Sequence, residues 1–400
     1  MAAPKNITIA DFNYSLPDEK IAKFPLKERD KCKLLIYKDG QIRESVFTEV
    51  ENLLEPGSLL AVNNTKVIPA RMIFHTPNGA RIEIFCLEPH LPADYDSIFA
   101  SRSECEWKCL AGNQKRWKDF DLHMHIPDGD GEFVLSAAKK QLLNGEVIVR
   151  FYWDGGMSFS EVIDAAGSIP IPPYLNREAE ESDTVDYQTI YSAHKGSVAA
   201  PTAGLHFTPE LLKRLKCDFA QLTLHVGAGT FKPVKTETIG GHEMHREFFS
   251  VTKDFLKSLI SHSGRVTAVG TTTVRTLESL YWLGVKMINN NPADHLSQWE
   301  CYDMDNTAIS AGQSISAIIN YLESNNMETF KASTGIMICP GYKYRIVNNI
   351  ITNFHQPEST LLLLVCAAIG QKWKEIYDYA LSHDFRFLSY GDSCYLKING

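Results

Sequence analysis

The stretch Ser197–Phe231, S-V-A-A-P-T-A-G-L-H-F-T-P-E-L-L-K-R-L-K-C-D-F-A-Q-L-T-L-H-V-G-A-G-T-F, places two histidines, His206 and His225, among small residues. Between the histidines, Thr208 and Pro209 mark the start of a short amphipathic helix, with the threonine as N-cap. The apolar residues that precede His225 predict a buried strand. This stretch therefore alternates helix and strand, which is typical of an α/β domain.

The residues that follow the predicted strand have little or no side-chain bulk. Gly227 and Gly229 flank an alanine, and Thr230 comes next. Glycines at a strand end allow backbone N–H groups to approach a ligand closely. We therefore expect the two histidines and this bare backbone to meet at the carboxyl edge of a sheet, where ligands bind in open α/β folds.

Composition restricts the class of protein. The 400 residues suggest two to three domains, and 44% hydrophobic with 22% charged residues is ordinary for a soluble globular protein. The nine cysteines are scattered, which fits reduced thiols in the cytoplasm. The longest apolar run, Leu361–Ile369, is too short to span a membrane. A net charge of −8 disfavours bulk non-specific binding of nucleic acid, although it allows a local basic patch.

An earlier buried strand, at about residues 57–62, ends abruptly in two amides, Asn63 and Asn64. Polar amides at the end of a buried strand suggest contact with a ligand. The same residues also suit an Asx-type turn that caps its own backbone. The local sequence leaves both interpretations open.

Residues 72–153 have a different sequence pattern, in which apolar and polar residues alternate and turn-forming residues are frequent. Short strands at this spacing predict an all-β unit, which we expect to be a small barrel. One edge carries the basic and aromatic run Lys115, Arg116, Trp117 and Lys118. Such a run can hold a nucleic-acid backbone and stack a base, but lysines also occur on ordinary solvated strand edges.

A second strand–turn–helix unit follows at residues 265–282. The strand ends at Gly270, and Thr271, Thr272 and Thr273 open the helix. Hydroxyls and free N–H groups at a helix N-terminus suit an anion, a ribose or a carboxylate. Simple N-capping by a threonine would explain one of the three threonines but not all.

The remaining chain adds a few expectations. Residues 286–330 are polar and irregular and predict a peripheral excursion, whereas residues 386–396 predict a pair of strands around a turn. His242 and His245 could supply two metal ligands, but we expect no metal site here. No Walker A, nucleophile-elbow or zincin motif is present.

Several blocks in order resemble the S-adenosylmethionine:tRNA ribosyltransferase-isomerases of queuosine biosynthesis. They are residues 198–207 (V-A-A-P-T-A-G-L-H-F), 223–231 (T-L-H-V-G-A-G-T-F), 269–275 (V-G-T-T-T-V-R), 63–71 (N-N-T-K-V-I-P-A-R) and 352–360 (T-N-F-H-Q-P-E-S-T), with Y-G-D at 390–392. Together they span nearly the whole chain. The resemblance implies an α/β main domain, residues 1–71 and 154–400, with an inserted β-barrel domain, residues 72–153.

The resemblance also implies an activity. The family transfers and isomerises the ribosyl part of S-adenosylmethionine onto 7-aminomethyl-7-deazaguanine (preQ1) at the wobble position of the tRNA anticodon. The product is epoxyqueuosine-tRNA, and adenine and methionine are released. S-adenosylmethionine is then a co-substrate, the partner is a tRNA anticodon stem-loop, no metal or membrane is involved, and a cytoplasmic monomer is expected.

This chemistry requires groups that move protons. The sulfonium acidifies the ribose C5′ protons, so a base such as a neutral histidine must remove one before adenine departs. The amine of the modified base then attacks, and a ribose oxygen displaces methionine. Our candidates for proton transfer are His206, His225 and His355, with Glu358 and Asp392 orienting them.

Two further groups of candidates complete the expected site. We expect the co-substrate to be held by Asn63, Asn64, Arg71, Thr202, Gly204, Gly227, Gly229, Thr230, Thr271, Thr272, Thr273, Arg275 and Asn353. We expect Lys115, Arg116, Trp117 and Lys118 to contact tRNA.

The chain departs from the family pattern in places. The 286–330 segment is longer than expected, Cys339 stands where an aromatic is expected, and Lys66 stands where arginine is common. A divergent paralogue remains as an alternative, either a non-catalytic RNA-binding protein or an S-adenosylmethionine-dependent methyltransferase. The latter would release S-adenosylhomocysteine in place of adenine.

Overall fold

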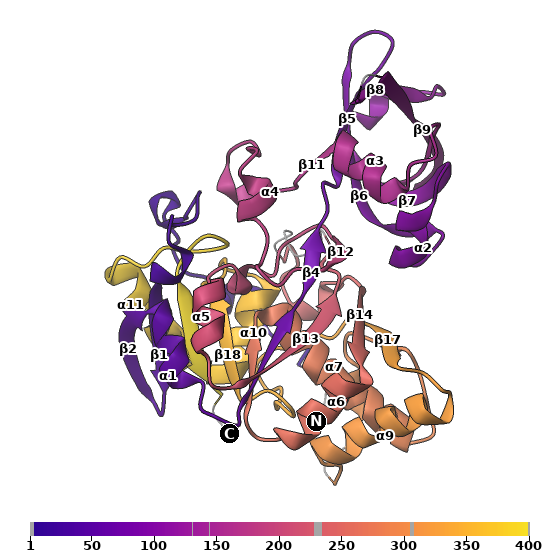
Figure 1. The fold of residues 1–400 in the computed structure, drawn as a ribbon. Helices are drawn as coiled ribbons and strands as arrows, with labels where there is room; N and C mark the ends of the chain where they lie inside the picture. Colours follow the sequence, from indigo (N-terminus) through magenta and orange to yellow (C-terminus); the bar gives the residue numbers. More distant parts are fainter. Residues whose placement is uncertain (1–3, 130, 144, 228–233, 305–307, 399–400) are drawn as a thin grey trace.

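The chain is organised around a ten-stranded mixed sheet (Figure 1). The computed structural model describes residues 4–398 apart from residues 130, 144, 228–233 and 305–307. The strands follow the order β16 (His295–Leu296), β17 (Thr329–Thr334), β14 (Glu247–Thr252), β13 (Asp218–Leu224), β3 (Leu59–Asn63), β15 (Val266–Val269), β18 (Asn349–Asn353), β19 (Ser393–Lys397), β1 (Lys33–Lys38) and β2 (Gln41–Val46).

The four central strands, β13, β3, β15 and β18, are parallel. Both faces of these strands are covered, so β3 is buried along its whole length. Its side chains alternate between two cores. Leu59 and Ala61 join the larger cluster on one face, whereas Leu60 and Val62 join a second cluster on the other face.

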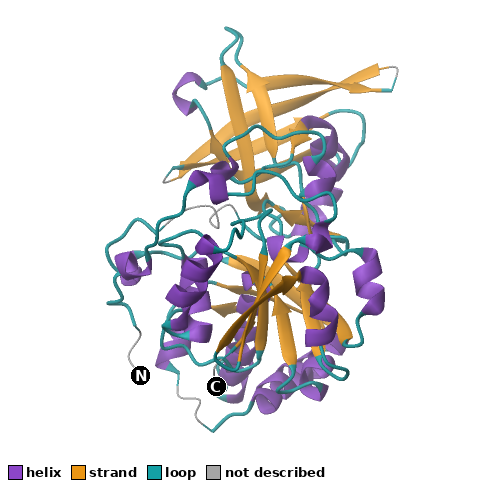
Figure 2. Ribbon diagram, turned by 90° about the vertical axis from the view of Figure 1, so that its left-hand side faces the viewer, coloured by secondary structure: helices purple, strands orange, loops and turns teal. Residues whose placement is uncertain are grey.

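Helices cover both faces of the sheet (Figure 2). The larger core contains side chains of α6 (Lys253–Ser261), α7 (Thr271–Ile288), α9 (Ala311–Ser324), α10 (Thr360–Ile369) and α11 (Lys372–Ser382). The opposite face packs against α1 (Val50–Leu53) and α5 (Pro209–Arg214). The N-cap predicted for α5 is confirmed, because Thr208 accepts the N–H of Leu211 and Pro209 is the first helical residue.

A separate antiparallel barrel is inserted after β3. Its strands are β5 (Arg71–His75), β6 (Arg81–Leu91), β7 (Glu104–Ala111), β10 (Glu146–Trp153), β9 (Gly131–Leu143) and β8 (Leu122–Asp128). A further pairing of β5 with β8, at His75 and His123, closes the barrel. The predicted fold class, an α/β domain with an inserted all-β barrel, is confirmed. The predicted domain boundaries stay a prediction.

Short elements link the barrel to the main sheet. β4 (Thr65–Val67) runs upward from β3 and pairs in parallel with β12 (His194–Ser197) (Figure 1). On the return path, α3 (Phe159–Ala166) packs beside α2 (Tyr95–Ala100), and β11 (Gly167–Ser168) pairs with β5. A one-turn helix, α4 (Asp183–Asp186), follows.

The segments 286–330 and 386–396 can be compared with their sequence-based predictions. The segment 286–330 contains the end of α7, β16, α8 (Glu300–Asp303) and α9, and it leads into β17 at one edge of the main sheet. The predicted strand pair at residues 386–396 is wrong, because only β19 is a strand there. Asp392 instead accepts hydrogen bonds from the N–H groups of Lys33 and Arg386, which hold the preceding residues in a loop.

None of the helices in the described part of the chain combines the length and apolarity that crossing a lipid bilayer requires.

Candidate active site at the carboxyl edge of the sheet

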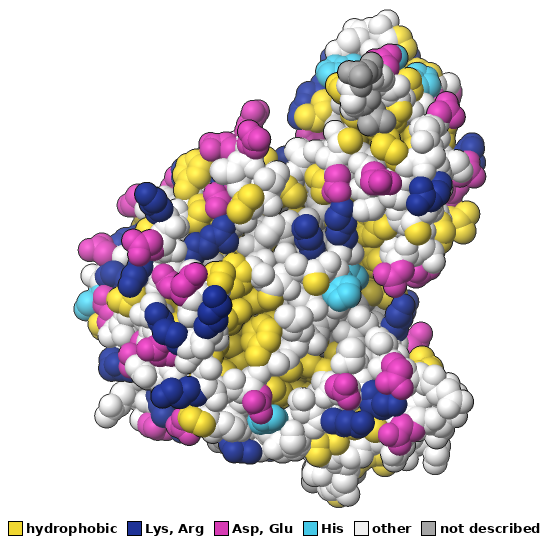
Figure 3. All heavy atoms as spheres, viewed as in Figure 1, with side chains coloured by type: hydrophobic (Ala, Val, Ile, Leu, Met, Phe, Trp, Pro, Cys, Tyr) yellow, Lys and Arg dark blue, Asp and Glu magenta, His cyan; other side chains and the backbone are white. Residues whose placement is uncertain are grey.

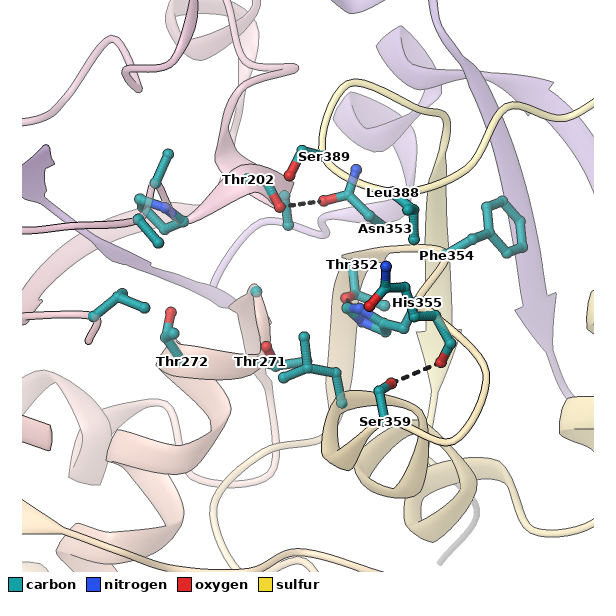
Figure 4. Close-up of a pocket in the computed structure, with 18 of the residues that line it drawn as sticks. Thr202, Thr271, Thr272, Thr352, Asn353, Phe354, His355, Ser359, Leu388 and Ser389 are labelled. Atoms are coloured by element: carbon teal, nitrogen blue, oxygen red, sulfur yellow. Dashed lines mark hydrogen bonds between the residues drawn. The ribbon is translucent and has the colours of Figure 1, made fainter. Parts of the chain in front are cut away.

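The carboxyl ends of β15 and β18 face one cavity, which we call the edge cavity (Figure 4). Its volume is about 810 Å³ with the open space at its mouth included. The polar residues that line it end β18, follow β15 or β18, or come from other loops: Tyr174, Tyr187, Thr202, Thr271, Thr272, Thr352, Asn353, His355, Gln356, Ser359, Thr360 and Ser389. Parallel strands place these distant segments together, as expected for an α/β fold.

The N-terminus of α7 forms one wall of the edge cavity. Gly270 adopts a φ of 85°, which favours glycine and turns the chain from β15 into the helix. Thr271 and Thr272 line the cavity, and the Oγ1 atom of Thr272 is buried with no hydrogen-bond partner among the described residues. Thr273 instead donates its hydroxyl to the carbonyl of Val269, so its role is structural.

A chain of polar contacts leads from the edge cavity to His206. Thr202 Oγ1 donates to Asn353 Oδ1 at 2.9 Å, as Figure 4 shows, and Asn353 Nδ2 lies 3.1 Å from His206 Nε2. The other ring nitrogen of His206 lies 3.2 Å from Cys32 Sγ. Burial lowers the pKa of His206 to about 3. His206 therefore orients Asn353 as a neutral ring and does not itself line the edge cavity.

His355 lines the edge cavity directly (Figure 4). Its Nε2 atom lies 2.8 Å from Thr352 Oγ1, and its backbone N–H donates to Tyr377. Its carbonyl accepts the hydroxyl of Tyr14. Burial lowers the pKa of this imidazole to about 3, so it is neutral at neutral pH.

His225 faces a second and larger cavity, which we call the cleft cavity, because it lies between the main sheet and α2 of the inserted segment. Its volume is about 1930 Å³ with open space included. The ring of His225 lies 4.0 Å from the ring of Tyr95, and its Nδ1 atom lies 3.1 Å from Thr65 Oγ1. Burial lowers the pKa of His225 to about 4. Gly196 permits this stack, since a Cβ there would lie 2.5 Å from His225 Nδ1.

A third cavity adjoins the edge cavity at the start of α7 and α10. We call it the helix-end cavity. It shares Thr271, Thr272, Thr360 and Leu361 with the edge cavity, and it is further lined by His242, Met244, His245, Glu247, Arg275, Ile336, Met337, Ile338 and Leu364. Arg275 and Glu247 form a buried ion pair in its wall.

Comparison with known proteins identifies the family. A family model described as "Queuosine biosynthesis protein" matches residues 9–396. The chain belongs to the queuosine biosynthesis family. It is 36% identical over 396 residues to a Trichlorobacter lovleyi protein named S-adenosylmethionine:tRNA ribosyltransferase-isomerase, covering 96% of this chain and 98% of that protein. A protein of the same name from Halothermothrix orenii is also 36% identical, over 395 residues, with the same coverage.

A solved structure is also similar. The crystal structure of S-adenosylmethionine tRNA ribosyltransferase from Thermotoga maritima is 28% identical and covers 96% of this chain and 99% of that one, with a TM-score of 0.46.

In this queuosine biosynthesis family member, several predicted ligand-binding residues have structural roles. Asn63 bonds to both backbone groups of Leu224 and joins β3 to β13. Arg71 pairs with Glu83 on the barrel. A Cβ on Gly204 would lie 2.1 Å from the Tyr191 hydroxyl, so this glycine serves packing.

Several other predicted residues are not among those that line the edge cavity. Asn64 lines the cleft cavity and accepts the hydroxyl of Thr223. Glu358, with a φ of 54°, donates its N–H to the carbonyl of Phe12, and Asp392 holds the loop described above. Gly227 follows Val226, which lines the edge cavity. Gly229 and Thr230 lie outside the described residues.

The predicted tRNA-binding run needs one correction. Trp117 is only 1% exposed, its indole N–H donates to the carbonyl of Phe120, and Lys139 lies over its ring. It therefore packs in the barrel core and offers no face on which a base could stack. Lys115, Arg116 and Lys118 are exposed, so they stay available for a phosphate backbone.

Three groups of site residues were not predicted from the sequence. Tyr174 and Tyr187 reach the edge cavity from the segment after the barrel, and Ser389 reaches it from the loop before β19. Tyr95 stacks on His225 from within the inserted segment. No local motif marks these residues, since only the folded chain brings them to the sheet edge. Within the described residues, no group of three His, Cys, Asp or Glu side chains is arranged to hold a metal ion.

Proposed function

We propose that this chain is an S-adenosylmethionine:tRNA ribosyltransferase-isomerase. The observation that carries the proposal is the 36% identity, over 96% of the chain, to relatives of that name. The arrangement of the edge cavity supports it. Hydroxyls, an amide, an imidazole and two helix N-termini surround a cavity of suitable size for a nucleoside. No metal is required for the proposed steps.

The proposed reaction begins with S-adenosylmethionine in the edge cavity. The sulfonium acidifies the ribose C5′–H bond, and we assign His355 as the base that accepts this proton. Its neutral ring has the form that a base needs. Because burial disfavours the protonated ring, His355 would then readily pass the proton to the departing adenine.

The second substrate would enter from the cleft cavity. His225 and Val226 are neighbours in sequence, yet they line the cleft cavity and the edge cavity respectively. A tRNA base in the cleft cavity would thus lie across a thin wall from the ribose. Lys195, Arg246 and Lys331 line the cleft cavity and carry charges that suit phosphates. Figure 3 shows the molecule hollowed between barrel and main domain, with basic side chains nearby.

The proposal extends to the acceptor, the later steps and the products of the reaction. The acceptor is preQ1 in the anticodon stem-loop, the amine of the base attacks the ribosyl group as a free amine, and a ribose oxygen displaces methionine to close the epoxide. Methionine and adenine leave in equal amounts. We further propose that the protein acts as a monomer in the cytoplasm.

One assay tests the proposal. The purified protein is incubated with S-adenosylmethionine and with tRNA that carries 7-aminomethyl-7-deazaguanine, and the small molecules are separated by chromatography. We expect adenine and methionine to appear together, and only with the modified tRNA. Production of S-adenosylhomocysteine, or no consumption of S-adenosylmethionine, would contradict the proposal.

A further inference from the structure

The ion pair in the helix-end cavity occupies only part of the Arg275 guanidinium. Arg275, on the first turns of α7, is 7% exposed, and Glu247, at the start of β14, is 4% exposed. One terminal nitrogen of Arg275, Nη1, bonds to Glu247. Among the residues that the structure describes, the Nε and Nη2 atoms of Arg275 are buried without any hydrogen-bond partner. Buried donors without partners are costly, so these atoms need an acceptor that the described part of the chain does not supply.

The surroundings define what that acceptor can be. The N-termini of α7 and α10 both border the cavity, through Thr271, Thr272 and Thr360, and both favour negative charge. The carboxylate of Glu247 lies in the same wall and would repel a phosphate dianion. It would, however, attract an ammonium group. A small group with one carboxylate and one ammonium therefore matches the site.

We infer that the helix-end cavity binds the amino-acid end of S-adenosylmethionine, with Arg275 and the start of α7 holding the α-carboxylate and Glu247 holding the α-ammonium. This inference rests on the proposed function. It assigns the nucleoside to the edge cavity and the methionine part to the helix-end cavity, on either side of the shared residues Thr271 and Thr272. The apolar side chains of Met244, Met337 and Leu364 would contact the methylene groups.

The proposed displacement leaves the charges held by this site unchanged. Displacement breaks the bond between C5′ of the ribosyl unit and sulfur, and the electron pair of that bond stays on sulfur, which becomes a neutral thioether. The carboxylate and ammonium do not change charge in this step. The site would thus hold the leaving methionine in the same way before and after the bond breaks.

Equilibrium binding to the full chain tests the inference. Isothermal titration would compare S-adenosylmethionine, decarboxylated S-adenosylmethionine and 5′-methylthioadenosine. We expect the unmodified protein to bind S-adenosylmethionine about 10- to 100-fold more tightly than the decarboxylated form, as a charged hydrogen bond is lost. Arg275→Met should weaken binding of S-adenosylmethionine by a similar factor and leave the other two affinities within about twofold.

Arg345→Met provides a matched control. Within the described residues, Arg345 also has a buried Nε atom without a hydrogen-bond partner. Its guanidinium, however, lies over the rings of Tyr281 and Trp282, and it lines a different cavity, near α9. Its replacement should leave all three affinities unchanged. If Arg275→Met does not fold, the double variant Arg275→Gln with Glu247→Gln removes both charges together and should bind S-adenosylmethionine no better than its decarboxylated form.

Equal affinity of the unmodified protein for S-adenosylmethionine and its decarboxylated form would overturn the inference. An equal loss of affinity for all three ligands in folded Arg275→Met would also overturn it. The same holds if the double variant still binds S-adenosylmethionine more tightly than the decarboxylated form. The proposed function fails separately. If the binding tests fail but adenine is still released from S-adenosylmethionine with modified tRNA, only the assignment of this cavity is wrong. If no adenine is released and none of the three ligands binds, both the proposed function and the assignment of the cavity are wrong.

Discussion

At the residue scale, three histidines, two buried and one half-buried, differ in what they can reach. His355 lines the edge cavity, His206 lies behind Asn353, and His225 stacks on Tyr95 in the cleft cavity. Burial lowers the pKa of each ring. All three are thus neutral at neutral pH, but only His355 lies where the nucleoside is proposed to bind.

The position of His355 predicts a specific loss of chemistry. His355→Gln should lower the rate of adenine release by roughly 10²- to 10⁴-fold, the usual contribution of a positioned base, with affinity for S-adenosylmethionine changed only a few-fold. Single-turnover kinetics with modified tRNA would measure the rate. His383→Gln, at an exposed residue stacked on Tyr379, serves as the control and should react normally. A near-normal rate for His355→Gln would exclude it as the base.

The same histidines predict how stability depends on pH. Because their pKa values are lowered in the folded state, the unfolded chain takes up protons first as pH falls below about 6.5. The stabilisation is therefore complete above that pH and is lost on acidification toward pH 3 to 4, by about 1.4 kcal/mol per pH unit for each histidine. Urea unfolding between pH 7 and 5 would measure it. His206→Gln should reduce the slope by about one histidine's share, and an unchanged slope would contradict this.

At the scale of an element, α7 unites the site and the core. Its N-terminus borders the edge and helix-end cavities, and Glu278 in its middle accepts the backbone N–H groups of residues 345, 346 and 347 and the hydroxyl of Tyr342. Further along, Gly284 meets α9, where a Cβ would lie 2.1 Å from the carbonyl oxygen of Ser314. The helix can hold its N-terminus in place because its other end packs this closely.

The contact of α7 with α9 predicts the effect of adding one methyl group. Gly284→Ala should destabilise the fold by about 1–3 kcal/mol, since backbone must shift to admit the Cβ. Gly312→Ala is the matched control, because the nearest atom to its Cβ would be 4.0 Å away, and alanine should there be neutral or stabilising by up to about 1 kcal/mol. Urea unfolding of both variants would measure the difference, and equal stabilities would contradict the packing argument.

At the scale of the whole molecule, the barrel and the main domain together form the cleft cavity. Asp94, Tyr95, Asp96 and Phe99 line it from the inserted segment, and β13, β14 and β17 line it from the main sheet. Lys331 on β17 lies 3.5 Å from Asp96 and is largely exposed. Because an exposed ion pair is weak, a phosphate in the cleft cavity could replace Asp96 as the partner of Lys331.

This arrangement predicts a contribution of Lys331 to tRNA binding. Lys331→Gln should weaken binding and lower the slope of log affinity against log salt by about 1, the value for one phosphate contact, without changing affinity for S-adenosylmethionine. Filter binding over a salt series would measure it. Lys374→Gln on α11, on the opposite side of the main domain in Figure 1, should leave the slope unchanged. Equal slopes for both variants would exclude a phosphate contact at Lys331.

Much of the fold was predictable because it follows from local patterns. The Thr208 N-cap, the parallel strands ending at Asn63 and Val269, and the switch to short alternating strands after residue 71 are all visible in the sequence. The site was predictable only in part. Asn353 ends β18, and His355, Thr271 and Thr272 come directly after strand ends, so the sheet determines their placement.

Other assignments depend on how whole segments pack. The local sequence around Arg71 does not show whether this residue binds a ligand or pairs with Glu83. Likewise, three neighbouring basic residues do not show whether Trp117 is exposed or, as the structure has it, buried. The residue pattern alone therefore established the family, the two kinds of domain and the strand ends that carry the chemistry. Folding decided which histidine reaches the cavity and where the unpaired nitrogens of Arg275 lie, because burial and hydrogen-bond partners come from residues far apart in the chain.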